Sequence, residues 1–169
     1  MDIGAFLVGH EAAIRLGAFL SVFALMALWE VAGPRRALTV RKGRRWLANI
    51  GITLLDAAVV RVLFPTAMVG VALAVGESGW GLFNAVAVPA PLAFVLSLLA
   101  LDLLIWAQHI AFHRVPLLAR LHRVHHADLD FDVTTGFRFH PIEIVLSLLL
   151  KSAAIVALGA PAAAVLVFE

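Results

Sequence analysis

The sequence contains no cysteine among its 169 residues. This absence excludes disulfide bonds, thiolate metal sites, iron–sulfur ligation and cysteine nucleophiles. Any metal ion that the chain binds must therefore be held by nitrogen and oxygen ligands.

Charged residues are also scarce, at 14% of the positions, whereas hydrophobic residues make up 63%. Soluble domains contain roughly 45–50% apolar residues, and the mean hydropathy of this chain is +1.00. We therefore expect the lipid bilayer to be its solvent. The formal net charge is only +2, and no basic stripe with interleaved aromatic residues occurs, so no nucleic-acid partner is expected.

Apolar segments follow one another along the chain, at about residues 14–31, 46–75, 88–112 and 142–168. Each is long enough to cross roughly 30 Å of hydrocarbon as a helix. The sequence therefore predicts an all-α fold, a single membrane domain over residues 1–169 with about four transmembrane helices. Gly159-Ala160-Pro161 interrupts the last segment, which is either one kinked span or a helix followed by the start of another.

Basic residues follow the first and third apolar segments, but none lies between the second and third. They are Arg35, Arg36, Arg41, Lys42, Arg44 and Arg45 after the first, and Arg114, Arg120, Arg123 and Arg138 after the third. The positive-inside rule then predicts an outside N-terminus and a cytoplasmic connection after the third segment. We expect a bacterial inner membrane, although an endoplasmic reticulum protein would obey the same rule.

A histidine motif of the form H-x-x-x-H ends the third apolar segment. On a helix, Asp102, Trp106, His109 and His113 fall within an arc of about 60°, so the two imidazoles could grip one ion. Asp102 lies about 10 Å along the axis from His109. We therefore expect it, at most, to hold a histidine ligand by a hydrogen bond.

A second motif, H-x-x-H-H, follows directly. Pro116 ends the preceding helix, and a short helix after it would place His122, His125 and His126 within an arc of about 100°. Neutral imidazole is a good ligand for iron, zinc and copper. The histidine region, residues 102–143, is therefore predicted to bind two metals, or one metal beside a proton relay.

Other polar residues outside the two motifs are interpreted one by one. His140 precedes Pro141 and is either a ligand or a cap of the turn, whereas His10 is expected to be an incidental residue at the membrane interface. Asn49, Thr53 and Asp56 share one helical face, where buried polar groups pair with each other or with Asp102.

The two histidine motifs also carry a resemblance to a known family. The run D-L-L-I-W-A-Q-H-I-A-F-H-R-V-P-L-L-A-R-L-H-R-V-H-H-A-D, followed by T-T-G-F-R-F-H-P-I-E, resembles the fatty acid hydroxylase superfamily, also called the sterol desaturase family. This resemblance implies a non-haem di-iron centre that uses O2 to hydroxylate or desaturate a lipid. It assigns His109 and His113 to the first histidine cluster and His122, His125 and His126 to the second. It places His140 in an R-x-H-P-x-E element, as ligand or as organiser of the site.

The resemblance also implies partners: a lipid substrate, O2, the bilayer and an external electron donor such as a cytochrome or ferredoxin. The chain itself has no dinucleotide glycine fingerprint, haem-attachment motif or cysteine cluster that would supply electrons. Sterols, fatty acyl chains and other lipids remain open as substrates, as do hydroxylation and desaturation.

Family members continue into an H-x-N element and a final H-x-x-H-H cluster, neither of which this sequence contains. We therefore expect an incomplete form, whose 169 residues alone do not turn over substrate. The alternative is a non-catalytic membrane protein whose degenerate histidine cluster binds zinc, the substitute metal, or nothing. A membrane cytochrome is disfavoured, because His10 is the only histidine before the third segment and axial haem ligands must face one another.

Overall fold

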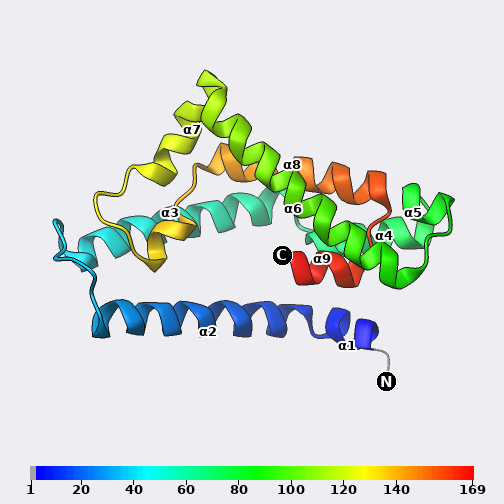
Figure 1. Cartoon of the computed structure of the whole chain (residues 1–169), viewed down its shortest axis with the longest axis horizontal. Helices are drawn as coiled ribbons and strands as arrows, with labels where there is room; N and C mark the ends of the chain where they lie inside the picture. The colour runs from blue at the N-terminus through cyan, green and yellow to red at the C-terminus, as the bar shows by residue number, and fades with distance from the viewer. Residues whose placement is uncertain (1–2) are drawn as a thin grey trace. The chain divides into compact units, whose positions relative to one another are not determined.

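The computed structural model describes residues 3–169, which form helices and no strand, so the predicted all-α fold is confirmed. In chain order the elements are α1 (Ile3–Gly9), α2 (Glu11–Ala32), α3 (Lys42–Leu63), α4 (Met68–Ser78), α5 (Leu82–Ala85), α6 (Ala90–Arg114), α7 (Pro116–His126), the 3-10 helix η1 (Val133–Phe137), α8 (Pro141–Leu158) and α9 (Ala162–Phe168) (Figure 1).

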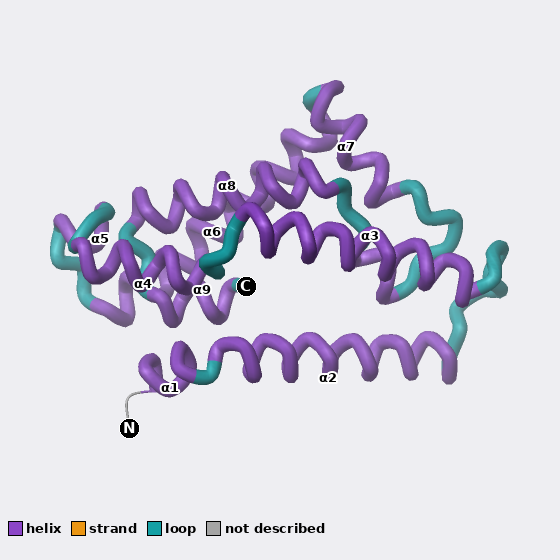
Figure 2. The backbone as a smooth tube through the Cα atoms, turned by 180° about the vertical axis from the view of Figure 1, so that it is seen from behind, coloured by secondary structure: helices purple, strands orange, loops and turns teal. Residues whose placement is uncertain are grey.

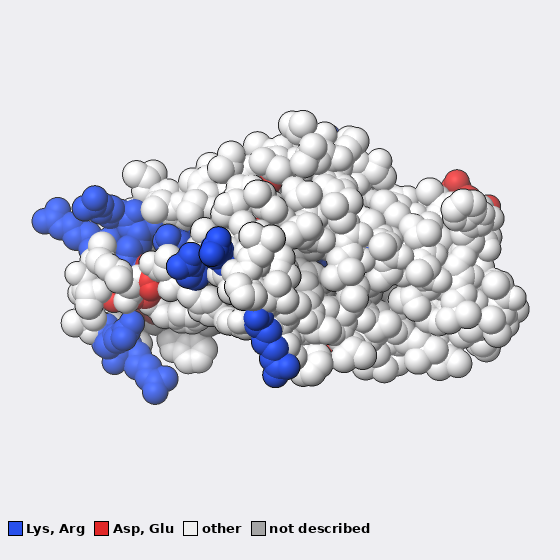
Figure 3. Space-filling model, turned by 90° about the horizontal axis from the view of Figure 1, so that it is seen from above, with Lys and Arg blue, Asp and Glu red and all other residues white. Residues whose placement is uncertain are grey.

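Within residues 3–169, four helical segments are long and apolar enough to cross a membrane: α2, the stretch from α3 to α5, α6 and α8. Among them α2 buries none of its side chains, and Leu25, Leu28 and Trp29 on it are each more than 60% exposed. In the space-filling view of Figure 3, much of the visible face carries neither acidic nor basic side chains. Apolar helices with outward-facing apolar side chains suggest a membrane protein.

The second apolar segment, at about residues 46–75, contains parts of two helices. The structure ends α3 at Leu63 and begins α4 at Met68, with Pro65 between them. Proline lacks the amide hydrogen that the helical ladder needs, and it disfavours helical geometry at the residue before it. The whole stretch from α3 to α5 still forms one of the segments that could cross a membrane.

The last apolar segment is a helix followed by a second one. Gly159 adopts a left-handed φ of +68° after α8, and Ala160 donates its N–H to the carbonyl of Ile155 at 3.1 Å. This is the usual glycine termination of a helix. Pro161 then starts α9, so the two-helix interpretation of this segment is the one the structure adopts.

The chain divides into two compact units, each assembled from distant parts of the sequence. The first contains the residues up to 15, 64–110 and 146–169, and the second contains 16–63 and 111–145. In the first unit α9 packs against α4 and α1, as Figures 1 and 2 show for α4 and α9. In the second unit, η1 packs against α3 and α7.

Candidate metal centre

The two histidine motifs are joined by a sharp turn between α6 and α7. Val115 has extended backbone angles, and Pro116 is the first residue of α7. Proline imposes both features, because it restricts the residue before it and suits the first position of a helix. The sequence therefore ends α6 one residue after His113 and starts a new helix that carries the second motif.

Within the second unit, this turn brings histidines of both motifs together. The ring centroid of His113 lies 4.7 Å from that of His122 and 5.0 Å from that of His126. The centroids of His122 and His126 are 4.9 Å apart, and His125 lies 5.0 Å from His126. Four imidazoles thus form one group, as the spacing of the two motifs predicts.

His109 lies one helical turn before His113 on α6. The H-x-x-x-H spacing therefore puts these two imidazoles on the same face of the helix. Imidazole nitrogens bind a metal such as zinc at about 2.0–2.1 Å. A donor set made of imidazoles fits iron or zinc.

The buried imidazole of His122 is oriented by a carboxylate. Its Nδ1 lies 2.7 Å from Oε1 of Glu143, in the first turn of α8. A neutral imidazole that donates its Nδ1 hydrogen to a carboxylate keeps Nε2 as the basic nitrogen, which is a common arrangement at metal-binding histidines. Burial lowers the pKa of His122, and the neighbouring imidazoles of His126 and His113 lower it further. The ring is therefore held in the neutral form that a ligand needs.

Glu143 is a residue whose role the sequence analysis missed. It belongs to the same R-x-H-P-x-E element as His140, and it is a buried acid at the start of a mostly apolar helix. A charged residue at such a position is a signal of function. Asp102, which was expected to hold a ligand, is exposed on α6, and that role stays a prediction.

His140 caps the start of α8. Its Nδ1 accepts a hydrogen bond from the backbone N–H of Ile142 at 3.1 Å, which satisfies one of the amides left over at a helix N-terminus. Its role as a ligand therefore stays a prediction. His10 contacts the carbonyl of Phe6, four residues earlier, at 2.9 Å and is exposed.

The region that contains these histidines is similar to a known protein family. Residues 94–169 match the family model described as fatty acid hydroxylase. This hydroxylase segment is similar to the fatty acid hydroxylase family. No curated protein and no solved structure matches the chain. The family suggests an oxidoreductase that hydroxylates or desaturates lipids, and the hydroxylase segment contains every predicted ligand as well as Glu143.

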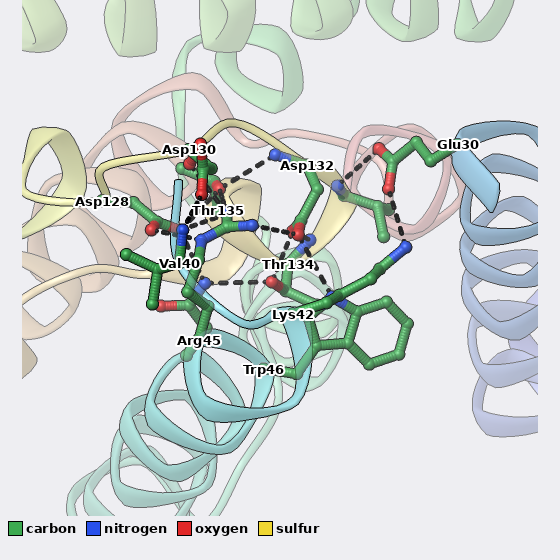
Figure 4. A network of polar contacts seen from close by, with 12 residues as sticks. Glu30, Val40, Lys42, Arg45, Trp46, Asp128, Asp130, Asp132, Thr134 and Thr135 are labelled. Atoms are coloured by element: carbon green, nitrogen blue, oxygen red, sulfur yellow. Dashed lines mark hydrogen bonds and ion pairs between the residues drawn. The ribbon is translucent and has the colours of Figure 1, made fainter. Parts of the chain in front are cut away.

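The hydroxylase segment is tied to α3 by a buried ion-pair network (Figure 4). Arg45 donates from Nε and Nη2 to the two carboxylate oxygens of Asp128, each at 2.7 Å, and from Nη1 to Asp132 at 2.8 Å. Nη2 also donates to the backbone carbonyl of Asp130 at 2.7 Å. The side chains of Arg45, Asp128 and Asp132 are each 4% exposed. The sequence analysis grouped Arg45 with the basic residues that set topology. In the structure it is buried and binds the acids of the loop after α7.

Asn49 extends this network towards α7. It donates to Asp128 and Thr134, both at 2.9 Å, and its own oxygen accepts from Arg138 at 3.0 Å. Arg138 also donates to the carbonyl of Val124 in α7 at 2.8 Å. The polar face of α3 is therefore linked to the C-terminal end of α7 by hydrogen bonds that involve residues 127–138.

The other two residues of that predicted face behave differently. Thr53 donates to the backbone carbonyl of Asn49 at 2.9 Å, a bond within the helix that threonine commonly makes and that does not pair the side chains of the face. Asp56 is buried, and neither of its oxygens has a hydrogen-bond partner among the described residues.

The acids of the loop remain ionised in this setting. The hydrogen bond from Arg45 holds the pKa of Asp128 well below its usual range. The backbone N–H groups of Thr39 and Val40 lower the pKa of Asp130. Hydrogen bonds to the charged form favour it, so three carboxylates can stay charged beside a single buried guanidinium.

Proposed function

We propose that this chain is a membrane-bound lipid hydroxylase or desaturase whose histidines hold a non-haem di-iron centre that uses O2. The proposed ligands are His109, His113, His122, His125 and His126. The observation that carries the proposal is the convergence of imidazoles from two motifs inside a fatty acid hydroxylase segment.

The bound iron would supply the oxidising power for breaking a lipid C–H bond with O2. The residues of the chain supply the setting. Glu143 holds the His122 imidazole by its Nδ1 hydrogen, and burial keeps that ring neutral. Phe139 stacks on His125 with ring centroids 4.6 Å apart, and Phe112 lies 5.8 Å from His122. These aromatic rings lie against the imidazoles of His122 and His125.

The substrate side is apolar. Leu103 and Trp106 on α6 are each 61% exposed and precede the first histidine motif on the same helix. A lipid chain that lies along α6 would meet these apolar side chains before it reaches His109. The proposal includes an external electron donor, such as a cytochrome or ferredoxin, and a histidine centre on the cytoplasmic side of the membrane.

Isotope labelling tests this function. The protein is expressed from its complete gene in cells supplied with oxygen-18 gas, and extracted lipids are analysed by mass spectrometry. A hydroxylase adds one labelled oxygen to a lipid, whereas a desaturase removes two hydrogens without adding label.

The matched variants are His113→Ala/His126→Ala and, as a control, His10→Ala. We expect the new product with the wild type and with the control, and its loss in the double variant. A product that persists in the double variant would contradict the role of the histidines. A lipid profile unchanged by expression of the wild type would favour the non-catalytic, zinc-binding alternative.

A further inference from the structure

The loop after α7 buries its acidic side chains and exposes its apolar ones, which is the reverse of a loop that faces water. Along residues 128–132 aspartates alternate with apolar residues, and the side chains of the three aspartates are at most 4% exposed. Leu129 and Phe131, in contrast, are 73% and 82% exposed. Because Arg45 and backbone amides hold the acids inside, the apolar side chains are turned outwards. Such a surface is suited to an apolar phase or ligand.

Phe131 borders a cavity of about 820 Å³ within the second unit. The cavity lies between the C-terminal end of α2, the α2–α3 connection and this loop. Its apolar lining is formed by Met26, Trp29, Val31, Leu38 and Phe131. Ligand pockets in proteins are commonly about 300–1,000 Å³, so the space admits a polar headgroup together with the first part of an acyl chain.

Cationic side chains surround the same cavity: Arg35, Arg36 and Lys42. The two acids in the lining are already engaged. Glu30 accepts from the backbone N–H of Val133 at 2.7 Å and lies 3.9 Å from Lys42, as Figure 4 shows. Asp132 is bound to Arg45.

Arg35 and Arg36 are exposed and can attract an anion, although Arg36 also forms a long ion pair with Asp130. Arg36 is 66% exposed and only 4.0 Å from Asp130 at its nearest approach, and Arg35 is exposed. Figure 3 shows basic side chains gathered together on one part of the visible face. An apolar floor with a cationic rim is complementary to an amphiphile with a negative headgroup.

We propose that this cavity binds an anionic phospholipid of the bilayer. Arg35 and Arg36 contact its phosphate, and one acyl chain lies against Trp29 and Phe131. The site is separate from the histidine cluster, so the proposal does not depend on the iron chemistry. A basic residue near an anionic lipid surface strengthens binding about fivefold, and the apolar lining favours a lipid over a free anion.

Lipid titration tests the cationic rim. The detergent-purified full chain is titrated with dioleoyl phosphatidylglycerol or dioleoyl phosphatidylcholine, and bound lipid is counted by native mass spectrometry. We expect tighter binding of phosphatidylglycerol, weakened about tenfold or more in Arg35→Gln/Arg36→Gln. The matched control, Arg41→Gln/Arg44→Gln, removes two charges from the same segment but none from the cavity lining. It should stay within about twofold of the wild type, and circular dichroism confirms that each variant is folded.

A second arm tests the apolar half of the site with the variant Phe131→Ser and with inorganic phosphate as competitor. We expect Phe131→Ser to weaken binding of phosphatidylglycerol and phosphate to leave it bound. Equal losses in the two arginine variants would reduce the effect to general surface charge and overturn the proposal. Displacement by phosphate would replace the lipid site with a simple anion site, and equal binding of phosphatidylcholine would also overturn it.

Discussion

At the scale of single residues, the buried contact between His122 and Glu143 decides the state of the candidate metal centre. The carboxylate lies 2.7 Å from Nδ1 and so fixes which ring nitrogen carries the hydrogen. A charged partner also makes the imidazole a stronger donor to a metal.

Glu143→Gln keeps the size of this side chain and removes its charge. We expect metal affinity to fall about 10–100-fold, the usual effect of losing such a hydrogen-bonding partner. Competition between the purified protein and a fluorescent chelator for Zn²⁺ or Fe²⁺ measures the change. The control is Glu77→Gln, at an exposed acid of α4. Unchanged affinity in Glu143→Gln would show that Glu143 does not tune the site.

Arg45 offers a test of the buried network. Arg45→Ala leaves the acids Asp128 and Asp132 buried without their cation, and breaking a buried ion pair costs about 3–5 kcal/mol of unfolding free energy. The control Arg44→Ala removes a neighbouring exposed charge and should change the unfolding free energy by about 0.5 kcal/mol or less. Denaturant unfolding in detergent, followed by circular dichroism, compares them. Similar losses in the two variants would contradict the structural role of Arg45.

Asp132 contributes to the dependence of the unfolding free energy on pH at acidic pH. Burial alone would raise its pKa, but hydrogen bonds from the hydroxyl and N–H of Thr134, together with the charge of Arg45, lower it. A depressed pKa contributes stability that is complete above the unfolded value of about 3.9 and is lost as the pH falls through the folded value. Asp132→Asn should therefore show a shallower loss of stability below about pH 4 than the wild type. Parallel curves from unfolding at a series of pH values would disprove this contribution.

At the scale of elements, the turn between α8 and α9 depends on a glycine in the left-handed region. A Cβ on Gly159 would lie 2.8 Å from Nδ2 of Asn84 and from the carbonyl of Trp80. A side chain in this backbone conformation costs about 1–2 kcal/mol before any clash is counted.

Gly159→Ala should lower the unfolding free energy by about 1–3 kcal/mol. The control is Gly76→Ala, because a Cβ there meets nothing within 4 Å and alanine in a helix gains about 0.5–1 kcal/mol over glycine. Thermal unfolding in detergent should move in opposite directions in the two variants. A neutral Gly159→Ala would mean that the turn relaxes freely.

The end of a helix could be predicted where a proline lies at the boundary between apolar and polar sequence. Pro116 separates an apolar helix from a histidine-rich one, and the break appears where expected. Pro65 lies inside continuous apolar sequence, so the hydrophobic pattern alone does not mark the end of α3. The backbone chemistry of proline accounts for the break at that position.

At the scale of the whole molecule, residues close in sequence were predictable and distant pairings were not. Helical spacing placed the histidines of each motif on one face, and the short α6–α7 turn limits where the second motif can lie. The contacts of Arg45 with Asp128 and of Asn49 with Thr134 join residues that are more than 75 positions apart. No local sequence pattern predicts these contacts. The positive-inside rule explained Arg45 only as a residue that sets membrane topology.

If the histidine group is a di-iron centre, the protein binds iron in a fixed ratio. Elemental analysis of the detergent-purified protein, expressed from its complete gene, measures this ratio directly. We expect two irons per chain, retained in His10→Ala and lost in His122→Ala/His126→Ala. An absence of iron from the wild type, or an equal iron content in all three proteins, would contradict it.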